Sequence, residues 1–256
     1  NSEFLPTSMP FKEKYASTGE FEKLKARMVV GGHRQDRSLY SKKDTSSPTP
    51  RTESGFIVLT LAAHEERHTG LADVPAAYLN AYKNQNTPTT YIKFSKGMTA
   101  AFVSLDRSKY AKYVDKDGSM WGRLSKALYG GVDSGKLWND TFHEFISNLG
   151  FVRNEVDVCV YNGSDDFGNQ ITVVVYVDDI LATCVNRDAI KDLFERIKIR
   201  FDGIVYKIGD KFSYLGITVE MARDRRAVRL TMEHYVEELL KDTETCRGSP
   251  TPATSD

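Results

Sequence analysis

Two adjacent carboxylates, Asp178 and Asp179, interrupt an apolar run between Gln170 and Cys184. Residues 171–177 are all β-branched or aromatic, which predicts a strand that is buried on both faces. Adjacent anions inside such a run are costly unless they lie at a solvated hairpin turn or bind a cation. The residues alone leave a β-turn and a metal site as alternatives.

A third carboxylate, Asp73, ends the short apolar stretch GLADV. If this stretch is a strand beside the 170–184 hairpin, Asp73, Asp178 and Asp179 meet at one edge of a sheet. Carboxylates that cannot neutralise one another recruit hard divalent cations, Mg²⁺ above all. Two such ions about 3.5–4 Å apart clamp the attacking and leaving oxygens of a phosphoryl transfer. Periodicity does not establish the pairing that this site requires.

A second pattern, HEERH at 64–68, matches the zinc-protease helix motif, in which His64 and His68 would share one face. No third ligand follows at a suitable spacing. The match also lies in the last turn before Gly70, where the helix dipole favours His and Arg. We interpret it as a polar helix end, with a metalloprotease as a distant alternative.

Composition indicates an ordinary globular protein, since 40% of the 256 residues are hydrophobic and 27% are charged. No run approaches the roughly 18 apolar residues of a membrane span, and no secretory signal is evident. Three cysteines without CxxC pairing favour a reducing intracellular compartment and disfavour structural zinc. The formal net charge is zero, but residues 10–51 carry ten Lys or Arg against five Asp or Glu. This segment is either a phosphate-facing surface or a solvated face.

Strands and helices are mixed along the chain, and residues 83–118 lack clear periodicity. We expect a hairpin over 11–32, which turns at 17–19 and closes with Met28 to Val30. A helix over 52–70 follows, with Thr52 as its N-cap and Gly70 as its stop, and then a short strand from 71 that becomes irregular. The remaining expected elements are a strand and a helix within 118–151, strands at 156–163 and 170–184, a helix at 187–201, strands at 211–221 and 227–232, and a helix at 234–242.

Antiparallel hairpins mixed with helices indicate the α+β class. The order of elements suits a split β-α-β antiparallel sheet with helices on one face. Residues 1–10 are interpreted as a tag or a disordered lead, and the Pro, Ser and Thr of the C-terminal tail as the approach to a linker or another domain.

Eight segments in chain order resemble the reverse transcriptase of copia-type LTR retrotransposons. They are KLKARMVVGGHRQD (23–36), SSPTPR (46–51), DVPAAYLNA (73–81), LSKALYG (124–130), LGFVRNEVDVCVY (149–161), YVDD (176–179), FSYLGITVEM (212–221) and TPAT (251–254). A four-letter motif alone is weak, but collinear blocks from about residue 11 to 252 cover nearly the whole chain. The sequence departs from the family at Asp133, where a basic stretch is usual, and at Pro75.

The resemblance implies the fingers and palm of a right-hand polymerase. It assigns the fingers to 11–70 and 83–130, the palm to 71–82 and 131–242 with a primer-grip hairpin, and the tail at 243–256 to the approach to a thumb that this chain lacks. It also implies an RNA-directed and DNA-directed DNA polymerase that extends a primer 3′ end by two-metal phosphoryl transfer. A catalytically silent nucleic-acid-binding or assembly module with the same fold is the alternative.

Site residues follow from the same resemblance. Asp73 and Asp178 would coordinate two Mg²⁺ ions, or Mn²⁺ in their place, with Asp179 in support and Val74 in the metal-binding set. The incoming deoxynucleotide would contact Lys25, Arg27, Ala76, Ala77, Tyr78, Tyr129 and Gly130. Tyr78 would exclude a 2′-hydroxyl, unless it is an ordinary core tyrosine. Tyr214, Leu215 and Gly216 would grip the primer, unless they only pack a sheet.

The implied partners are an RNA or DNA template with its primer, deoxynucleoside triphosphates, and a second copy or downstream thumb and ribonuclease H domains. No membrane partner is expected. The implied location is a cytoplasmic virus-like particle or the nucleus.

Overall fold

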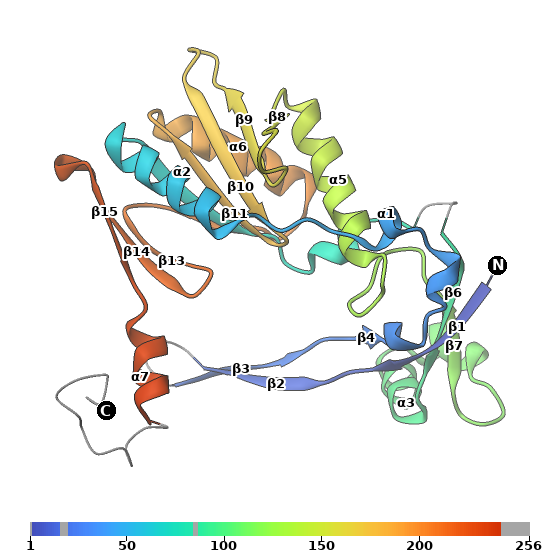
Figure 1. Ribbon diagram of the computed structural model, residues 1–256. Helices are drawn as coiled ribbons and strands as arrows, with labels where there is room; N and C mark the ends of the chain where they lie inside the picture. The colour runs from blue at the N-terminus through green and yellow to red at the C-terminus, as the bar shows by residue number, and fades with distance from the viewer. Residues whose placement is uncertain (1, 16–19, 84–86, 242–256) are drawn as a thin grey trace, which may run out of the picture.

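The computed structural model describes residues 2–15, 20–83 and 87–241 (Figure 1). Within them, two main sheets are joined by connecting segments, and a two-stranded ribbon extends away from the smaller sheet (Figure 1). No helix of the described part of the chain is long and apolar enough to cross a membrane. The proposed linker tail lies outside the described residues.

The larger sheet has six strands, and every neighbouring pair in it is antiparallel. Its order is β12 (Val205–Ile208), β5 (His68–Asp73), β11 (Asp179–Cys184), β10 (Gln170–Tyr176), β9 (Val160–Ser164) and β8 (Val152–Arg153). Five successive residues of β10, from Ile171 to Val175, are buried. The predicted strand is confirmed as buried on both faces over 171–175, whereas Tyr176 is exposed and Val177 lies in the turn.

Both faces of this sheet are covered. Helices α5 (Ser134–Asn148) and α6 (Arg187–Arg200) pack on one face through side chains such as Phe142 and Phe194. Helix α2 (Thr52–His64) covers the other, together with a sheet of β13 (Lys211–Tyr214), β14 (Ile217–Ala222) and β15 (Ala227–Thr231). The expected helices on one face are present as α5 and α6, and α2 adds cover on the other face that the expectation did not include, because central strands that are apolar at every position need cover on both sides.

The helix predicted to stop at Gly70 ends earlier. Helix α2 ends at His64, with Arg51 rather than Thr52 at its N-cap position, and Gly70 lies inside β5. A Cβ atom at Gly70 would lie 2.7 Å from the ring of Phe194 and 2.8 Å from Ile190. The glycine lets α6 approach the sheet closely, so its role is packing and not helix termination.

The smaller sheet contains four strands in the order β4 (Val29–Val30), β1 (Ser2–Ser8), β6 (Thr89–Phe94) and β7 (Met120–Arg123). Helices α3 (Lys96–Leu105) and α4 (Arg107–Tyr110) pack on one face of it, over a core that includes Leu5, Ile92 and Phe94. The prediction of a disordered lead is wrong, since β1 pairs in parallel with β6.

The ribbon consists of β2 (Phe11–Tyr15) and β3 (Phe21–Ala26), which pair antiparallel. Its predicted turn at 17–19 lies outside the described residues. The second strand stops at Ala26, and Val29–Val30 pairs with β1 instead, so the expectation that Met28 to Val30 closes the hairpin is wrong. The short helix α1 (Lys42–Thr45) lies before α2, and α7 (Glu233–Lys241) follows β15.

Candidate active site

A tight turn between β10 and β11 carries two of the three predicted carboxylates. Tyr176 lies opposite Asp179, so Val177 and Asp178 form the turn. Val177 has a φ of 54°, which is strained for a β-branched residue. The indole N–H of buried Trp138, on α5, donates to the Val177 carbonyl at 2.7 Å. A hydrogen bond from the core thus supports the backbone of the turn.

Strand β5 places the third carboxylate beside this turn. Asp73 lies opposite Asp179 in the paired strands β5 and β11. The backbone N–H of Val74, which is fully buried, donates to the Asp178 carbonyl at 2.9 Å. The strand pairing that the prediction required is therefore present. We call Asp73, Asp178 and Asp179 the carboxylate edge.

Burial and mutual repulsion raise the pKa of two of these carboxyl groups. The pKa of Asp179 rises to about 6, first because the group is withdrawn from water and then because Asp178 and Asp73 repel its charge. Burial also raises the pKa of Asp73, and Asp178 adds to that effect. Burial is thus the main cause of both pKa shifts, and repulsion among the aspartates is the second.

The donor chemistry of this edge fits a hard divalent cation, because carboxylate oxygens are the ligands that Mg²⁺ prefers. A cation would also relieve the repulsion that raises these pKa values. In the part of the chain that the structure describes, no three Asp, Glu, His or Cys side chains form a ready-made metal-binding group. The metal set of the three aspartates with Val74 stays a prediction.

Positive charges of the ribbon act on the same edge. Lys25, Lys14 and Arg27 lower the pKa of Asp73, against the larger effects of burial and Asp178. The guanidinium carbon of Arg27 also lies 5.2 Å from the ring centroid of Tyr129. The predicted triphosphate contacts Lys25 and Arg27 thus lie close enough to the carboxylate edge to influence it electrostatically.

Tyr78 and Tyr129 form an aromatic pair beside the edge, with ring centroids 4.9 Å apart and planes inclined at 55°. Burial raises the pKa of both phenols, and the charge of Asp178 contributes in each case. Both rings are half-buried, so neither is a fully enclosed core residue. Contact of Tyr78 and Tyr129 with a nucleotide stays a prediction.

Special backbone conformations position the neighbours of these tyrosines. Ala76 has a φ of 52° and precedes a 3₁₀ turn over Ala77–Asn80, in which Ala77 is buried. Gly130 has a φ of 87°, and a Cβ atom there would lie 2.3 Å from the Val30 carbonyl oxygen. Only glycine fits this close approach. The turn after Tyr129 is consequently fixed against β4.

The predicted primer-grip residues divide into a core residue and an exposed turn. Tyr214 is buried among α2 and the larger sheet, and its hydroxyl has no hydrogen-bond partner within the described residues. Leu215 and Gly216 form the turn between β13 and β14, both with positive φ, and Leu215 is 45% exposed. Sheet packing explains the Tyr214 ring, whereas primer contact by the turn stays a prediction.

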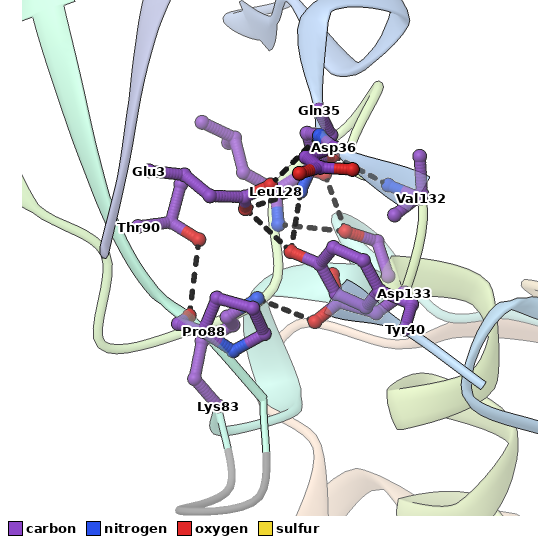
Figure 2. Close-up of polar contacts among 11 residues, drawn as sticks. Glu3, Gln35, Asp36, Tyr40, Lys83, Pro88, Thr90, Leu128, Val132 and Asp133 are labelled. Carbon is purple, nitrogen blue, oxygen red and sulfur yellow. Dashed lines mark hydrogen bonds and ion pairs between the residues drawn. The ribbon is translucent and has the colours of Figure 1, made fainter. Parts of the chain in front are cut away.

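A second polar cluster, which we call the junction network, joins the smaller sheet to α5 (Figure 2). Its side chains are Glu3, Gln35, Tyr40, Lys83 and Asp133. The Tyr40 hydroxyl and the Gln35 amide donate to the Glu3 carboxylate at 2.6 and 3.1 Å, and Lys83 forms a buried ion pair with Asp133. Asp133, the departure from the family pattern, therefore points into the protein.

The two histidines of the HEERH pattern do not share a helix. His64 ends α2, whereas His68 begins β5 opposite Cys184, and Glu66 between them has a φ of 56°. The helical zinc-protease arrangement is therefore not formed.

Sequence reasoning missed two features of the site. The contact of Trp138 with the Val177 carbonyl required knowledge of the tertiary fold. The role of Lys14 had a possible signal, because the ribbon register places Lys12 opposite Lys25 and Lys14 opposite Lys23. Like charges directly opposite each other destabilise a hairpin. Lys14 and Lys23 both pair with Glu22 of the same ribbon, at 2.8 and 3.6 Å, so part of this like-charge register is neutralised within the ribbon.

Comparisons with known proteins show similarity along nearly the whole chain. A family model described as "Reverse transcriptase (RNA-dependent DNA polymerase)" matches residues 1–254. The chain is 28% identical over 243 residues to the Retrovirus-related Pol polyprotein from transposon RE2 of Arabidopsis thaliana, covering 94% of this chain and 15% of the relative. It is 26% identical over 231 residues to the corresponding polyprotein from transposon TNT 1-94 of Nicotiana tabacum, covering 90% of this chain and 16% of the relative. The chain thus spans about a sixth of these relatives' length.

Among solved structures, the apo telomerase of Candida tropicalis, truncated from its C-terminal domain, matches with a TM-score of 0.42 and 10% identity. That match covers 88% of this chain and 55% of the telomerase chain.

Proposed function

The chain belongs to the reverse transcriptase (RNA-dependent DNA polymerase) family, and we propose that it is an active polymerase core that extends a primer 3′ end on an RNA or DNA template. The observation that carries the proposal is the carboxylate edge, where three aspartates meet at the end of paired strands and repel one another. Folding gains nothing from such repulsion, so its presence favours a site that binds cations.

Asp73 and Asp178 are the residues that would hold two Mg²⁺ ions, with Asp179 and the backbone at Val74 behind them. When bound, these ions supply neutralisation of the charge on the transferring phosphoryl group. The protein's own contribution is to hold the carboxylates in place. Trp138 does so through its hydrogen bond to the turn, and the N–H of Val74 through its bond to the Asp178 carbonyl.

The ribbon and the tyrosine pair would bind the incoming nucleotide. Lys25 and Arg27 would pair with its triphosphate, since their charges already act on Asp73. Tyr78 would lie against the sugar and exclude a 2′-hydroxyl, and Tyr129 would pack on the base. Ala76, Ala77 and Gly130 leave room for backbone approach to the nucleotide. The turn at Leu215 and Gly216 would contact the primer.

Primer extension tests this function. The full chain is given a DNA primer on an RNA template and, separately, on a DNA template, with deoxynucleotides and either Mg²⁺ or Mn²⁺. Asp178→Asn is compared with Asp166→Asn, which changes an exposed carboxylate in the loop between β9 and β10. We expect extension by the wild type and by Asp166→Asn, and none by Asp178→Asn.

Failure of the wild type in both metals needs a second measurement, because a missing thumb would weaken primer binding. Calorimetry of deoxynucleotide binding with Mg²⁺ provides it. Binding that disappears in Asp178→Asn would keep the proposed site. No binding by the wild type would favour the silent module instead.

A further inference from the structure

The smaller sheet has one covered face and one open face. Residues that alternate along β1 and β6, such as Leu5, Ile92 and Phe94, pack under α3. The residues between them point to the opposite side of the sheet, because successive side chains of a strand alternate. On that side lie Phe4, Tyr91, Lys93, Trp121 and Arg123, which we call the aromatic face.

Strand register arranges the aromatic face in two rows. Phe4 lies opposite Tyr91, which lies opposite Arg123, and in the next row Lys93 lies opposite Trp121. The rings of Phe4 and Tyr91 are stacked, with centroids 5.2 Å apart and planes inclined at 13°. Trp121 meets Phe4 edge to face at 5.7 Å. Three aromatic rings thus form one continuous surface with a cation in each row.

This surface is open to solvent. Phe4 is 64% exposed and Trp121 is 40% exposed. The Lys93 ammonium lies 5.5 Å from the Trp121 ring centroid and pairs with Asp117 at 3.0 Å, while Arg123 is exposed. Contiguous exposed aromatic side chains are unusual on a protein surface and mark a binding site. The core of the smaller sheet lies on its other face, so folding does not require them.

Aromatic rings interleaved with cations are the combination that binds single-stranded nucleic acid, since bases stack on the rings and phosphates pair with Lys or Arg. A second copy of the chain is a poorer partner. Lys93 is already paired with Asp117, whereas the exposed Arg123 has no ion-pair partner among the described residues, so the face carries a net positive charge. Charge complementarity therefore favours a polyanion.

We propose that the aromatic face binds single-stranded nucleic acid, with one base stacked on Phe4 and another on Trp121, and with Arg123 paired to a phosphate. Stacking of this kind tolerates any base, so the face would hold a strand without reading its sequence. The inference rests on the proposed function for the choice of nucleic acid as partner. It adds a binding surface on the smaller sheet, formed by residues other than those of the carboxylate edge.

Tryptophan fluorescence provides a direct test, because Trp121 is exposed while Trp138 is buried. The full chain is titrated with a single-stranded oligothymidine of about ten nucleotides, without deoxynucleotides or divalent cations. We expect quenching of the emission in the wild type and none in Trp121→Phe, which keeps an aromatic ring but leaves only the buried indole.

Anisotropy of a labelled oligonucleotide then measures the affinities of three further variants. Phe4→Ala is expected to weaken binding roughly tenfold, while Phe167→Ala, which removes an exposed phenylalanine from the β9–β10 loop, leaves it unchanged. Arg123→Gln is expected to lower the slope of log affinity against log salt by about one phosphate contact. This exposed substitution does not depend on the packing of β1, so it tests the face even if Phe4→Ala unfolds.

Unquenched Trp121 in the wild type, or equal affinities of the wild type, Phe4→Ala and Arg123→Gln, would overturn the inference. Self-association that the oligonucleotide does not reverse and that Phe4→Ala abolishes would identify a second copy as the partner and also overturn it. Primer extension separates this inference from the proposed function. Extension without Phe4-dependent binding leaves the function standing, and Phe4-dependent binding without extension or metal-dependent nucleotide binding leaves only the inference.

Discussion

The carboxylate edge and the junction network are two acidic clusters that the same chain treats in opposite ways. In the junction network, Glu3 accepts hydrogen bonds from Tyr40 and Gln35, and Asp133 pairs with Lys83. At the carboxylate edge, Asp73 lies opposite Asp179 in the paired strands, and the pKa of Asp179 rises to about 6 through burial and through repulsion by Asp178 and Asp73. Carboxylates that have hydrogen-bond donors or a cation within the protein, as in the junction network, stabilise the fold. Carboxylates that repel one another, as at the carboxylate edge, are expected to bind a cation from solution instead.

The largest expected effect separates activity from stability at the carboxylate edge. Asp73→Asn removes a proposed ligand of the Mg²⁺ ions, so primer extension should fall by at least about a hundredfold. It also removes one charge from the mutually repelling aspartates. Its free energy of unfolding in urea should be unchanged or higher than that of the wild type. A variant that loses stability along with activity would place the carboxylate edge in the same class as the junction network.

Breaking the ion pair of the junction network should lower the stability of the protein, in contrast to Asp73→Asn. Lys83→Met leaves Asp133 buried without a counter-charge, which costs about 3–5 kcal/mol of unfolding free energy. The double variant Lys83→Met with Asp133→Leu should recover most of that loss, because no buried charge is left alone. Urea denaturation measures both, and a neutral Lys83→Met would show that the pair does not support the fold.

Removal of a single hydroxyl gives a matched pair of smaller effects. Tyr40→Phe deletes a donor to the Glu3 carboxylate and should cost about 1–2 kcal/mol. Tyr214→Phe deletes a buried hydroxyl that has no partner among the described residues, so it should be neutral or slightly stabilising. Both are measured by thermal unfolding at one pH, and equal losses would contradict the distinction between satisfied and unsatisfied groups.

The smallest effect is a pH dependence at Asp179. Its pKa is raised from 3.8 to about 6 on folding, so its contribution to stability is fully present below about 4 and is lost as pH rises through about 6. Asp179→Asn should remove this loss, which amounts to about 1 kcal/mol after allowance for solvent screening. Unfolding free energies of the two proteins, measured without divalent cations, should therefore diverge between pH 4 and 7, while Asp166→Asn follows the wild type.

Parts of this architecture could be predicted from local patterns and parts could not. The 170–184 hairpin was evident because apolar residues at every position require cover on both faces. Strand β6 was missed because its residue types do not alternate between apolar and polar, although its burial does. The less buried face carries the aromatic Tyr91 beside Lys93, and the buried face begins with the polar Thr90. Helix α3 behind it had a usable signal in Ser95, whose hydroxyl accepts from the Met98 N–H at the N-cap.

The site was only partly visible for a different reason. Three aspartates suggested a metal site, but their meeting depends on a strand pairing between residues about a hundred positions apart, which local periodicity does not encode. Asp133 was evident only as a departure from a usually basic stretch, and its ion pair with Lys83 depends on the fold. The partners of such polar residues are distant in sequence, so local sequence patterns do not predict them.

The position of β5 in the larger sheet also governs when the chain can fold. Its two neighbours, β11 and β12, are both made more than a hundred residues after it. At synthesis rates of about 5–20 residues per second, β5 waits on the order of ten seconds for its first partner strand. During that interval its backbone donors and acceptors are open to wrong partners. Strand β5 is therefore the segment of the nascent chain that we expect a chaperone to protect.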